Sequence, residues 1–322
     1  MSNAEADWHA AYQWLCVRRR HAPPNADVWH LRYHWQHWGD ALFGSVLAGR
    51  YRLTPMQVHR RFGRTWVQWS AQDALVLKWV AMQVASLLPT HARCAHVKGH
   101  GGGRRSVQEV GQALGRGEYA FVYRTDIRGY YRHIRKVQVL SQVKNCVDDP
   151  VLIELIRQYL YYSVEDSGEF HTPKHGICRG CALSPLIGAS LLHHVDVYFA
   201  AQEGTFYARY MDDFVLFTRS RWQLRRSVKR LHEFFNLDGF ETHPDKTQIG
   251  RIEYGFDWLG IWFAREGPRI APRAQENHRA RVARLYEQAR HRGLSKTEAD
   301  AQVHEYEARW MLWANYHLKA AG

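Results

Sequence analysis

Apolar side chains recur at every second position between residues 206 and 217, on both sides of two adjacent carboxylates, Asp212 and Asp213. A period of two is typical of half-buried β-strands. The pattern therefore predicts two short strands joined by a tight turn, with both carboxylates at the tip of the hairpin. Adjacent like charges repel unless a cation neutralises them, so a bound cation would favour this arrangement. An exposed Asp-Asp turn without chemistry is the alternative.

A second β-rich run, residues 119–127, ends in another carboxylate, Asp126. A buried strand that delivers an Asp at its end can present that side chain to a metal ion. Ser167 and Gly168 predict a further short hairpin, because both residue types favour turns.

Helical spacing, with apolar residues every three to four positions, is typical of most of the remaining chain. Trp8, Tyr12 and Leu15 share one face of a first helix. Further helices are expected at residues 28–47, 71–88, 106–114, 184–198, 222–235 and, divided at Gly293, 274–321.

Capping residues indicate where two of these helices begin. Ser184, followed by Pro185, is predicted to be an N-cap ahead of the first helical residue. Ser295 and Glu298 have the spacing of a capping box.

The charge of the chain points to a polyanionic partner. The 322 residues suggest two or three domains, and 44 Lys and Arg against 31 Asp and Glu give a formal charge of +13. The cations are spread along the whole chain, which favours a folded basic surface that binds nucleic acid. The 13 Trp, 17 Tyr and 13 Phe can serve as core and as base-stacking platforms. A basic protein of the membrane surface is the competing interpretation.

No apolar run is long enough to cross a bilayer, and the first residues lack the features of a signal peptide. The five Cys form an odd, scattered set, which fits a reducing compartment better than a disulfide framework. These features predict a soluble, cytoplasmic protein.

Two clusters of potential ligands allow metal-binding interpretations. His30, His34 and His37 fall on one helical face and could bind a metal, but the surrounding aromatic residues favour a packing surface. Cys178 and Cys181 form a Cys-x-x-Cys, which allows zinc or redox interpretations, but no second pair lies close by.

Five blocks of this chain resemble the characteristic blocks of reverse transcriptases and occur in the same order. The blocks are Asp126–Tyr131, Gly176–Leu186, Tyr210–Asp213, Asp245–Thr247 and Phe256–Ile261. The Tyr-Met-Asp-Asp sequence between two apolar strands is the most specific of them. A looser resemblance reaches back to Tyr51.

The resemblance implies an α+β fold of the right-hand polymerase type. It comprises helical, basic fingers, a palm with an antiparallel sheet that includes a strand at 256–261, and a short helical thumb. The expected boundaries are an N-terminal helical extension at 1–50, fingers at 51–118, a palm with interleaved fingers elements at 119–265 and a thumb at 266–322.

The resemblance also implies nucleotidyl transfer assisted by two metal ions. Asp126 and Asp212 would bridge the ions, with the carbonyl of Ile127 nearby and Asp213 as an auxiliary carboxylate. Lys246 would meet the triphosphate and protonate the leaving pyrophosphate. Two Mg²⁺ ions are expected because Mg²⁺ prefers carboxylate and phosphate oxygens, with Mn²⁺ as a substitute.

A nucleotide-binding set follows from the same resemblance. Tyr131 would pack against the sugar and reject a 2′-hydroxyl, and Arg179 and Gly180 would lie in the loop under the nucleotide. Tyr210 and Lys246 complete the set. Arg179 replaces the Gln of the family's Pro-Gln-Gly, which predicts altered sugar discrimination or fidelity. The cations expected at the triphosphate are Arg60, Arg61, Arg64 and Lys78.

The Gly-rich segment 98–106 has backbone N–H groups that could approach phosphates closely, and a flexible turn is the alternative. Its place in the chain matches a family block that contacts the template or primer backbone. The predicted nucleic-acid-binding residues are Lys98, Arg104 and Arg105 in this segment, and Arg279 and Arg284 in the thumb.

The predicted function is RNA-directed DNA synthesis by a bacterial, group II intron-like enzyme, of a stand-alone mobile-element or defence-associated type. The expected partners are an RNA template, a primer, deoxynucleotides, a dedicated non-coding RNA and a second protein. Three alternatives stay open: untemplated or protein-primed synthesis, an RNA polymerase with the same palm, and a catalytically idle RNA-binding module.

Overall fold

The computed structural model describes residues 3–61 and 64–322. The chain forms two compact units, each built from two separate segments. The first unit takes the residues up to Thr90 and Gly129–His193, and the second takes His91–Arg128 and His194–Gly322. Helices combined with mainly antiparallel strands confirm the predicted α+β class.

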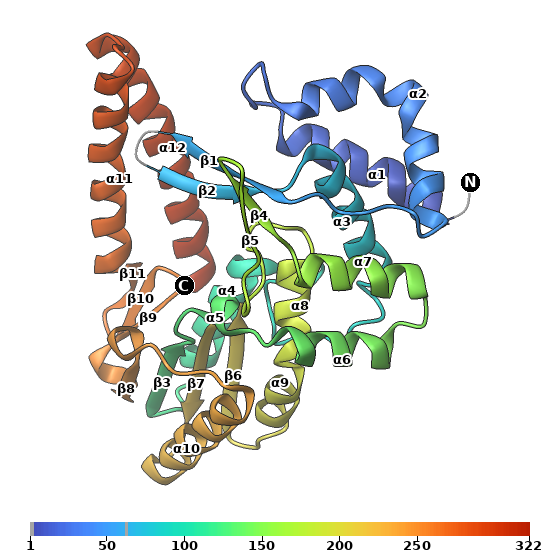
Figure 1. The fold of residues 1–322 in the computed structure, drawn as a ribbon. Helices are drawn as coiled ribbons and strands as arrows, with labels where there is room; N and C mark the ends of the chain where they lie inside the picture. Colours follow the sequence, from blue (N-terminus) through green and yellow to red (C-terminus); the bar gives the residue numbers. More distant parts are fainter. Residues whose placement is uncertain (1–2, 62–63) are drawn as a thin grey trace. The chain divides into compact units, whose positions relative to one another are not determined.

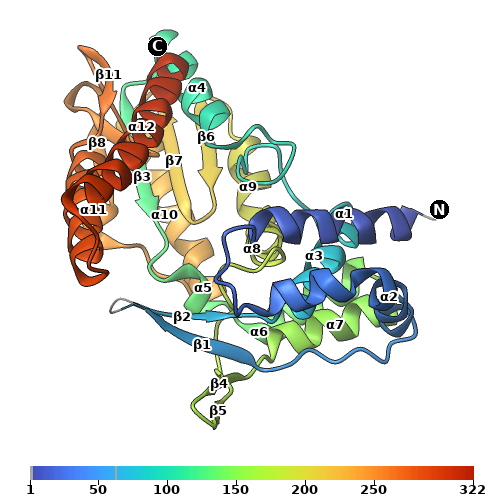
Figure 2. The same cartoon turned by 90° about the horizontal axis from the view of Figure 1, so that it is seen from above.

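Three N-terminal helices pack together in the first unit (Figure 2). They are α1 (Asn3–Arg18), α2 (Asp27–Leu47) and α3 (Ala71–Gln83). Trp8 of α1 is buried, its ring stacks on Phe43 with centroids 5.1 Å apart, and its indole N–H donates to the Gly39 carbonyl at 3.2 Å. A large aromatic ring with its polar group satisfied holds α1 against α2.

The third helix, α3, is shorter than predicted. The spacing predicted a helix to Leu88, but α3 ends at Gln83. The N–H groups of Leu87 and Leu88 both donate to the Val84 carbonyl at 3.1 Å. These bonds form turns that lead from α3 to Leu88, where the following Pro89 disfavours helical backbone.

The rest of the first unit consists of short helices and one sheet. The helices are α5 (Tyr130–His133), α6 (Lys136–Cys146), α7 (Pro150–Leu160) and α8 (Ser184–Leu191). The strands are β1 (Met56–Arg61), β2 (Arg64–Gln68), β4 (Val164–Asp166) and β5 (Glu169–His171), in the order β2-β1-β4-β5. The β4–β5 pair is the hairpin predicted at Ser167 and Gly168.

The prediction of a single helix at residues 184–198 is wrong. Two helices occupy this stretch, α8 and α9 (His193–Ala200), and Leu183 rather than Ser184 is the N-cap of α8. The Ser184 hydroxyl instead donates to the Cys178 carbonyl at 2.7 Å. The hydroxyl that was expected to cap the helix therefore holds the preceding loop.

An antiparallel sheet forms the centre of the second unit (Figure 1). Its strands are β3 (Phe121–Asp126), β6 (Thr205–Tyr210), β7 (Asp213–Thr218) and β8 (Gln248–Arg251), in the order β6-β7-β3-β8. On one face Phe214 contacts Phe235 of α10 (Arg221–Asp238), with ring centroids 5.2 Å apart. On the other face Val215 and Phe217 share a core with Val107 of α4 (Gly102–Gly115). Neighbouring residues of β7 thus lie on opposite faces of the sheet, as in any strand.

Helix α4 begins at Gly102, earlier than the predicted residue 106.

A three-stranded sheet and two long helices complete the second unit. The strands are β9 (Phe256–Trp258), β10 (Ile261–Ala264) and β11 (Gly267–Ile270), and the helices α11 (Pro272–His291) and α12 (Lys296–Ala321) lie side by side (Figure 1). The predicted capping box is confirmed, since Ser295 Oγ accepts from the Glu298 N–H at 3.3 Å. The single strand predicted at 256–261 is wrong, because Leu259 and Gly260 form a turn with φ values of 49° and 86°.

The helices of the described residues include none that is both long and apolar enough to cross a membrane.

Candidate active site

Asp212 and Asp213 lie at the tip of the β6–β7 hairpin, as the alternation predicted. Tyr210 pairs with Asp213, so the turn contains only Met211 and Asp212. Met211 has a φ of 57°, in the left-handed region that tight two-residue hairpin turns use. Asp212 therefore lies in the turn, and Asp213 is the first residue of β7.

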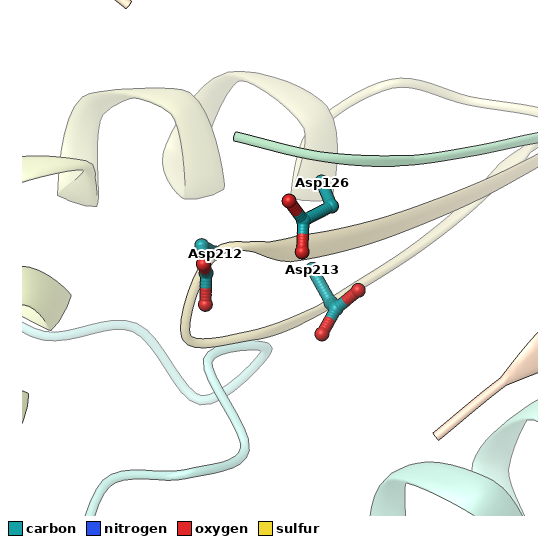
Figure 3. A group of neighbouring side chains, drawn as sticks. All are labelled: Asp126, Asp212 and Asp213. Carbon is teal, nitrogen blue, oxygen red and sulfur yellow. The ribbon is translucent and has the colours of Figure 1, made fainter. Parts of the chain in front are cut away.

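Asp126 brings a third carboxylate to this tip. It is the last residue of β3 and lies opposite Asp213 in the β3–β7 register. One carboxylate oxygen from each of Asp126, Asp212 and Asp213 lies within 4.8 Å of the other two (Figure 3). Three oxygen donors this close fit a divalent cation that prefers oxygen ligands. Among the described residues this is the one group of three such side chains close enough to share an ion.

Ile127, predicted beside the metal, joins the two segments that carry the carboxylates. Its side chain is buried, and its backbone N–H donates to the Asp212 carbonyl at 3.1 Å. This hydrogen bond joins the Met211–Asp212 turn to the residue after β3, one position beyond the last β3–β7 pair, Asp126 with Asp213.

Two cations offset the charge of the cluster. Nζ of Lys246 lies 2.6 Å from Oδ2 of Asp126, and Nη2 of Arg124 lies 2.9 Å from Oδ1 of Asp213. Burial raises the pKa of Asp213 to about 6, although Arg124 acts in the opposite direction, and the charges of Asp126 and Asp212 add to the rise. A cation bound at the cluster would favour the ionised form of Asp213.

Lys246 reaches the cluster because its segment runs beside the end of β3. The N–H of His243 donates to the Asp126 carbonyl at 2.7 Å. The short 3₁₀ helix η1 (Pro244–Lys246) follows, and Nη1 of Arg124 donates to the Lys246 carbonyl at 2.5 Å. The backbone of the lysine is thus fixed on the strand that ends in Asp126.

The reverse transcriptase (RNA-dependent DNA polymerase) family model matches residues 86–263, which include the three carboxylates and Lys246. The chain belongs to the reverse transcriptase family. This membership confirms the predicted family. Reverse transcriptase domains generally use divalent metal ions, in agreement with the carboxylate cluster.

Among solved structures, the chain is similar to that of apo telomerase from Candida tropicalis. The sequence identity is 12%, the match covers 71% of this chain and 50% of that chain, and the TM-score is 0.48. This chain therefore spans about half the length of that structure. A sequence comparison with curated proteins found no match.

The predicted nucleotide-binding residues of this reverse transcriptase lie in both units. In the first unit Tyr131 is buried in α5, and the guanidinium carbon of Arg179 lies 5.7 Å from the centre of its ring. Gly180 follows with a φ of 80°. The structure thus brings Arg179 to Tyr131, whereas Tyr210 and Lys246 belong to the second unit.

The candidate triphosphate-binding cations of the fingers make contacts within the first unit. Arg60 forms an ion pair with Asp166, and the ammonium of Lys78 lies 5.3 Å from the centre of a Trp14 ring. The side chains of Arg61 and Arg64 lie outside the described part of the structure. Triphosphate binding by these cations stays a prediction.

The predicted nucleic-acid-binding residues are all exposed on the second unit. They are Lys98, Arg104, Arg105, Arg279 and Arg284. The guanidinium carbon of Arg104 lies 4.1 Å from the centre of the Tyr316 ring of α12, and Arg105 pairs with Glu109 one helical turn away at 2.9 Å. Exposed guanidinium groups can still meet phosphates, so this role stays a prediction.

In the part of the chain that the structure describes, neither alternative metal site belongs to a group of three or more closely spaced ligands. The rings of His30 and His34 pack with centroids 4.6 Å apart, and His34 stacks on Trp38, so α2 carries the aromatic surface that the sequence favoured. Cys178 and Cys181 are buried, and burial raises the pKa of each thiol to about 12. A thiol that stays protonated at neutral pH does not suit redox exchange.

Sequence reasoning missed Arg124 and Arg209, two arginines inside the strands of the site. Arg124 is 8% exposed and Arg209 is fully buried. The signal was a charged residue within a strand that the pattern predicts to be buried. Burying an unpaired charge is costly, so each of these positions implies a close anionic partner.

Proposed function

We propose that this reverse transcriptase extends a primer with deoxynucleotides on an RNA template by two-metal-ion nucleotidyl transfer. The observation that carries the proposal is the carboxylate cluster at the hairpin tip, with Lys246 and Arg124 beside it. A protein that only binds nucleic acid has no use for three clustered carboxylates, because they repel a polyanion.

Asp126 and Asp212 would hold two Mg²⁺ ions, with Asp213 and the Ile127 carbonyl as further ligands. When bound, the ions activate the primer 3′-hydroxyl and stabilise the leaving pyrophosphate. The contribution of the chain is placement, since β3 and the hairpin hold the carboxylates at a fixed spacing. Lys246 would neutralise phosphate charge and donate a proton to the pyrophosphate.

The remaining site residues keep their sequence-based roles in this proposal. Tyr131, with Arg179 against its ring, would select the sugar, and Gly180 and Tyr210 would contact the nucleotide. Lys98 and the exposed arginines would meet template and primer phosphates. We assign the helical extension, fingers, palm and thumb to the ranges expected from the sequence. The group II-like subtype, the mobile-element or defence role, the cytoplasmic location, the dedicated RNA and the partner protein stay predictions.

The proposal is tested by extending a labelled DNA primer on an RNA template with Mg²⁺. Wild type is compared with Asp212→Asn, which keeps the shape of the side chain and removes its charge. Asp40→Asn, an exposed position on α2, is the matched control. We expect templated extension by wild type and by the control, and loss of extension in Asp212→Asn.

Other results would favour the alternatives. Products that do not copy the template indicate untemplated or protein-primed synthesis, and incorporation of ribonucleotides indicates an RNA polymerase. If wild type gives no extension even with RNA co-purified from cells, while binding of Mn²⁺ is unaffected by Asp212→Asn, the chain is an RNA-binding module.

A further inference from the structure

We propose that His96 is a positioning residue for the catalytic turn, holding the Met211 peptide so that Asp212 faces Asp126. The inference rests on the proposed function, since it concerns the carboxylates assigned to metal binding. His96 lies 115 positions before Met211 and outside the blocks that resemble the family.

The turn needs support because Met211 adopts a left-handed backbone. Its φ of 57° is unfavourable for a residue with a side chain, and glycine is the usual choice at such positions. Without outside contacts, this conformation would compete with others that turn Asp212 away from Asp126.

Both backbone polar groups of Met211 form hydrogen bonds with side chains. Its N–H donates to Nδ1 of His96 at 2.9 Å, and its carbonyl accepts from Nη1 of Arg209 at 3.0 Å. The next carbonyl, of Asp212, accepts from the Ile127 N–H at 3.1 Å. The peptide groups on each side of the Asp212 Cα are therefore fixed.

His96 is itself placed by a segment that pairs with β6. The Arg209 N–H donates to the Arg93 carbonyl and the Ala95 N–H donates to the Arg209 carbonyl, both at 2.9 Å. The His96 ring also meets the Tyr210 ring edge to face, with centroids 5.8 Å apart. His96 thus touches the two residues that precede Asp212.

The role of His96 requires a particular tautomer. A backbone N–H can only donate, so Nδ1 must carry a lone pair and the proton must lie on Nε2. Sγ of Cys94 lies 3.3 Å from the same nitrogen, and burial raises the pKa of this thiol to about 12, so it stays protonated and can donate. Both neighbours of Nδ1 are donors.

Arg209 supports the carbonyl side because a buried carboxylate fixes it. Its Nε and Nη2 lie 2.7 Å and 2.5 Å from the two oxygens of Asp196, and both side chains are fully buried. Tyr207 donates to Asp196 at 2.6 Å. With two of its nitrogens bound in this way, the guanidinium directs Nη1 to Met211.

The test compares three substitutions of His96. In His96→Asn the side-chain oxygen can take the place of Nδ1, in His96→Gln the acceptor lies one bond further out, and His96→Leu has no acceptor. His232→Leu is the control, since it removes a histidine bonded to Tyr123 at 3.0 Å in the same unit, away from the turn. Each variant is measured for kcat, for the deoxynucleotide KM, and for Mn²⁺ affinity without substrates by electron paramagnetic resonance.

We expect His96→Gln and His96→Leu to lower kcat by about tenfold to a hundredfold and to weaken Mn²⁺ binding, with the KM unchanged. His96→Asn should keep most of the wild-type kcat and Mn²⁺ affinity, and His232→Leu should match wild type in both. If Asn and Gln behave alike, or if His96→Leu matches wild type, the inference is overturned. Should His96→Leu fail to fold, the Asn and Gln pair decides. Mn²⁺ affinity keeps the test valid even if wild type extends no primer.

Discussion

The ammonium of Lys246 lies 2.6 Å from Oδ2 of Asp126, although 120 positions separate the two residues in the chain. The Asp126 side chain is 5% exposed and that of Lys246 is 25% exposed. In the protein without a metal ion, the lysine therefore neutralises the most buried carboxylate of the cluster.

Replacing this lysine should destabilise the metal-free protein. Lys246→Gln leaves Asp126 buried without its charged partner, and we expect a loss of about 1–3 kcal/mol in the free energy of unfolding. Added Mg²⁺ should recover part of the loss, because the ion takes over the neutralisation. Urea denaturation with and without Mg²⁺ measures both effects. Lys144→Gln, at an exposed position of α6, is the control, and equal stabilities of the two variants would contradict the prediction.

Metal binding should weaken below about pH 6. Burial raises the pKa of Asp213 to about 6 in the metal-free protein, so the side chain is protonated below this pH and ionised above it. A divalent ion needs the ionised form, so its apparent affinity should fall by up to about tenfold for each pH unit below 6. Titration with Mn²⁺ between pH 5 and 8 measures the dependence. Asp213→Asn should show a flatter profile, and a flat wild-type profile would rule the prediction out.

Only two of the five cysteines should react quickly with a thiol reagent in the native protein. Cys94, Cys178 and Cys181 are buried, and burial raises the pKa of each thiol to about 12. Thiolates are the reactive form, so these three should stay protected at pH 8, while the partly exposed Cys16 and Cys146 react. Counting the modified thiols by mass spectrometry before and after denaturation tests this. Rapid labelling of Cys178 and Cys181 in the native state would revive the redox interpretation.

The packing of α4 against α12 should depend on Gly111. A Cβ at this position would lie 2.2 Å from the Ala321 carbonyl oxygen, which must then move. We expect Gly111→Ala to cost about 1–3 kcal/mol of unfolding free energy. Gly115→Ala is the matched control on the same helix, because a Cβ there meets nothing within 4 Å. Thermal denaturation of both variants measures the effect. A decrease in the melting temperature no larger than that of the control would show that the end of α12 can move to make room for the added Cβ.

The sequence by itself was sufficient for the parts of this protein that depend on short-range pattern. The alternation around Asp212 and Asp213 predicted the hairpin and its tip, and the β-rich run placed Asp126 at a strand end. The order of the blocks identified the family. The hairpin and the strand end were inferred from residues within about ten positions, where period and turn chemistry decide the structure.

Only the tertiary structure decided which distant groups meet. Pairing of β3 with β7 sets Asp126 opposite Asp213, and His96 and Lys246 reach the turn and the strand end from 115 and 120 positions away. No local pattern contains such contacts, because they depend on the register of the sheet and on the path of loops across it. The break at Leu192 and the turn at Leu259 also escaped prediction, because the apolar pattern continues through both.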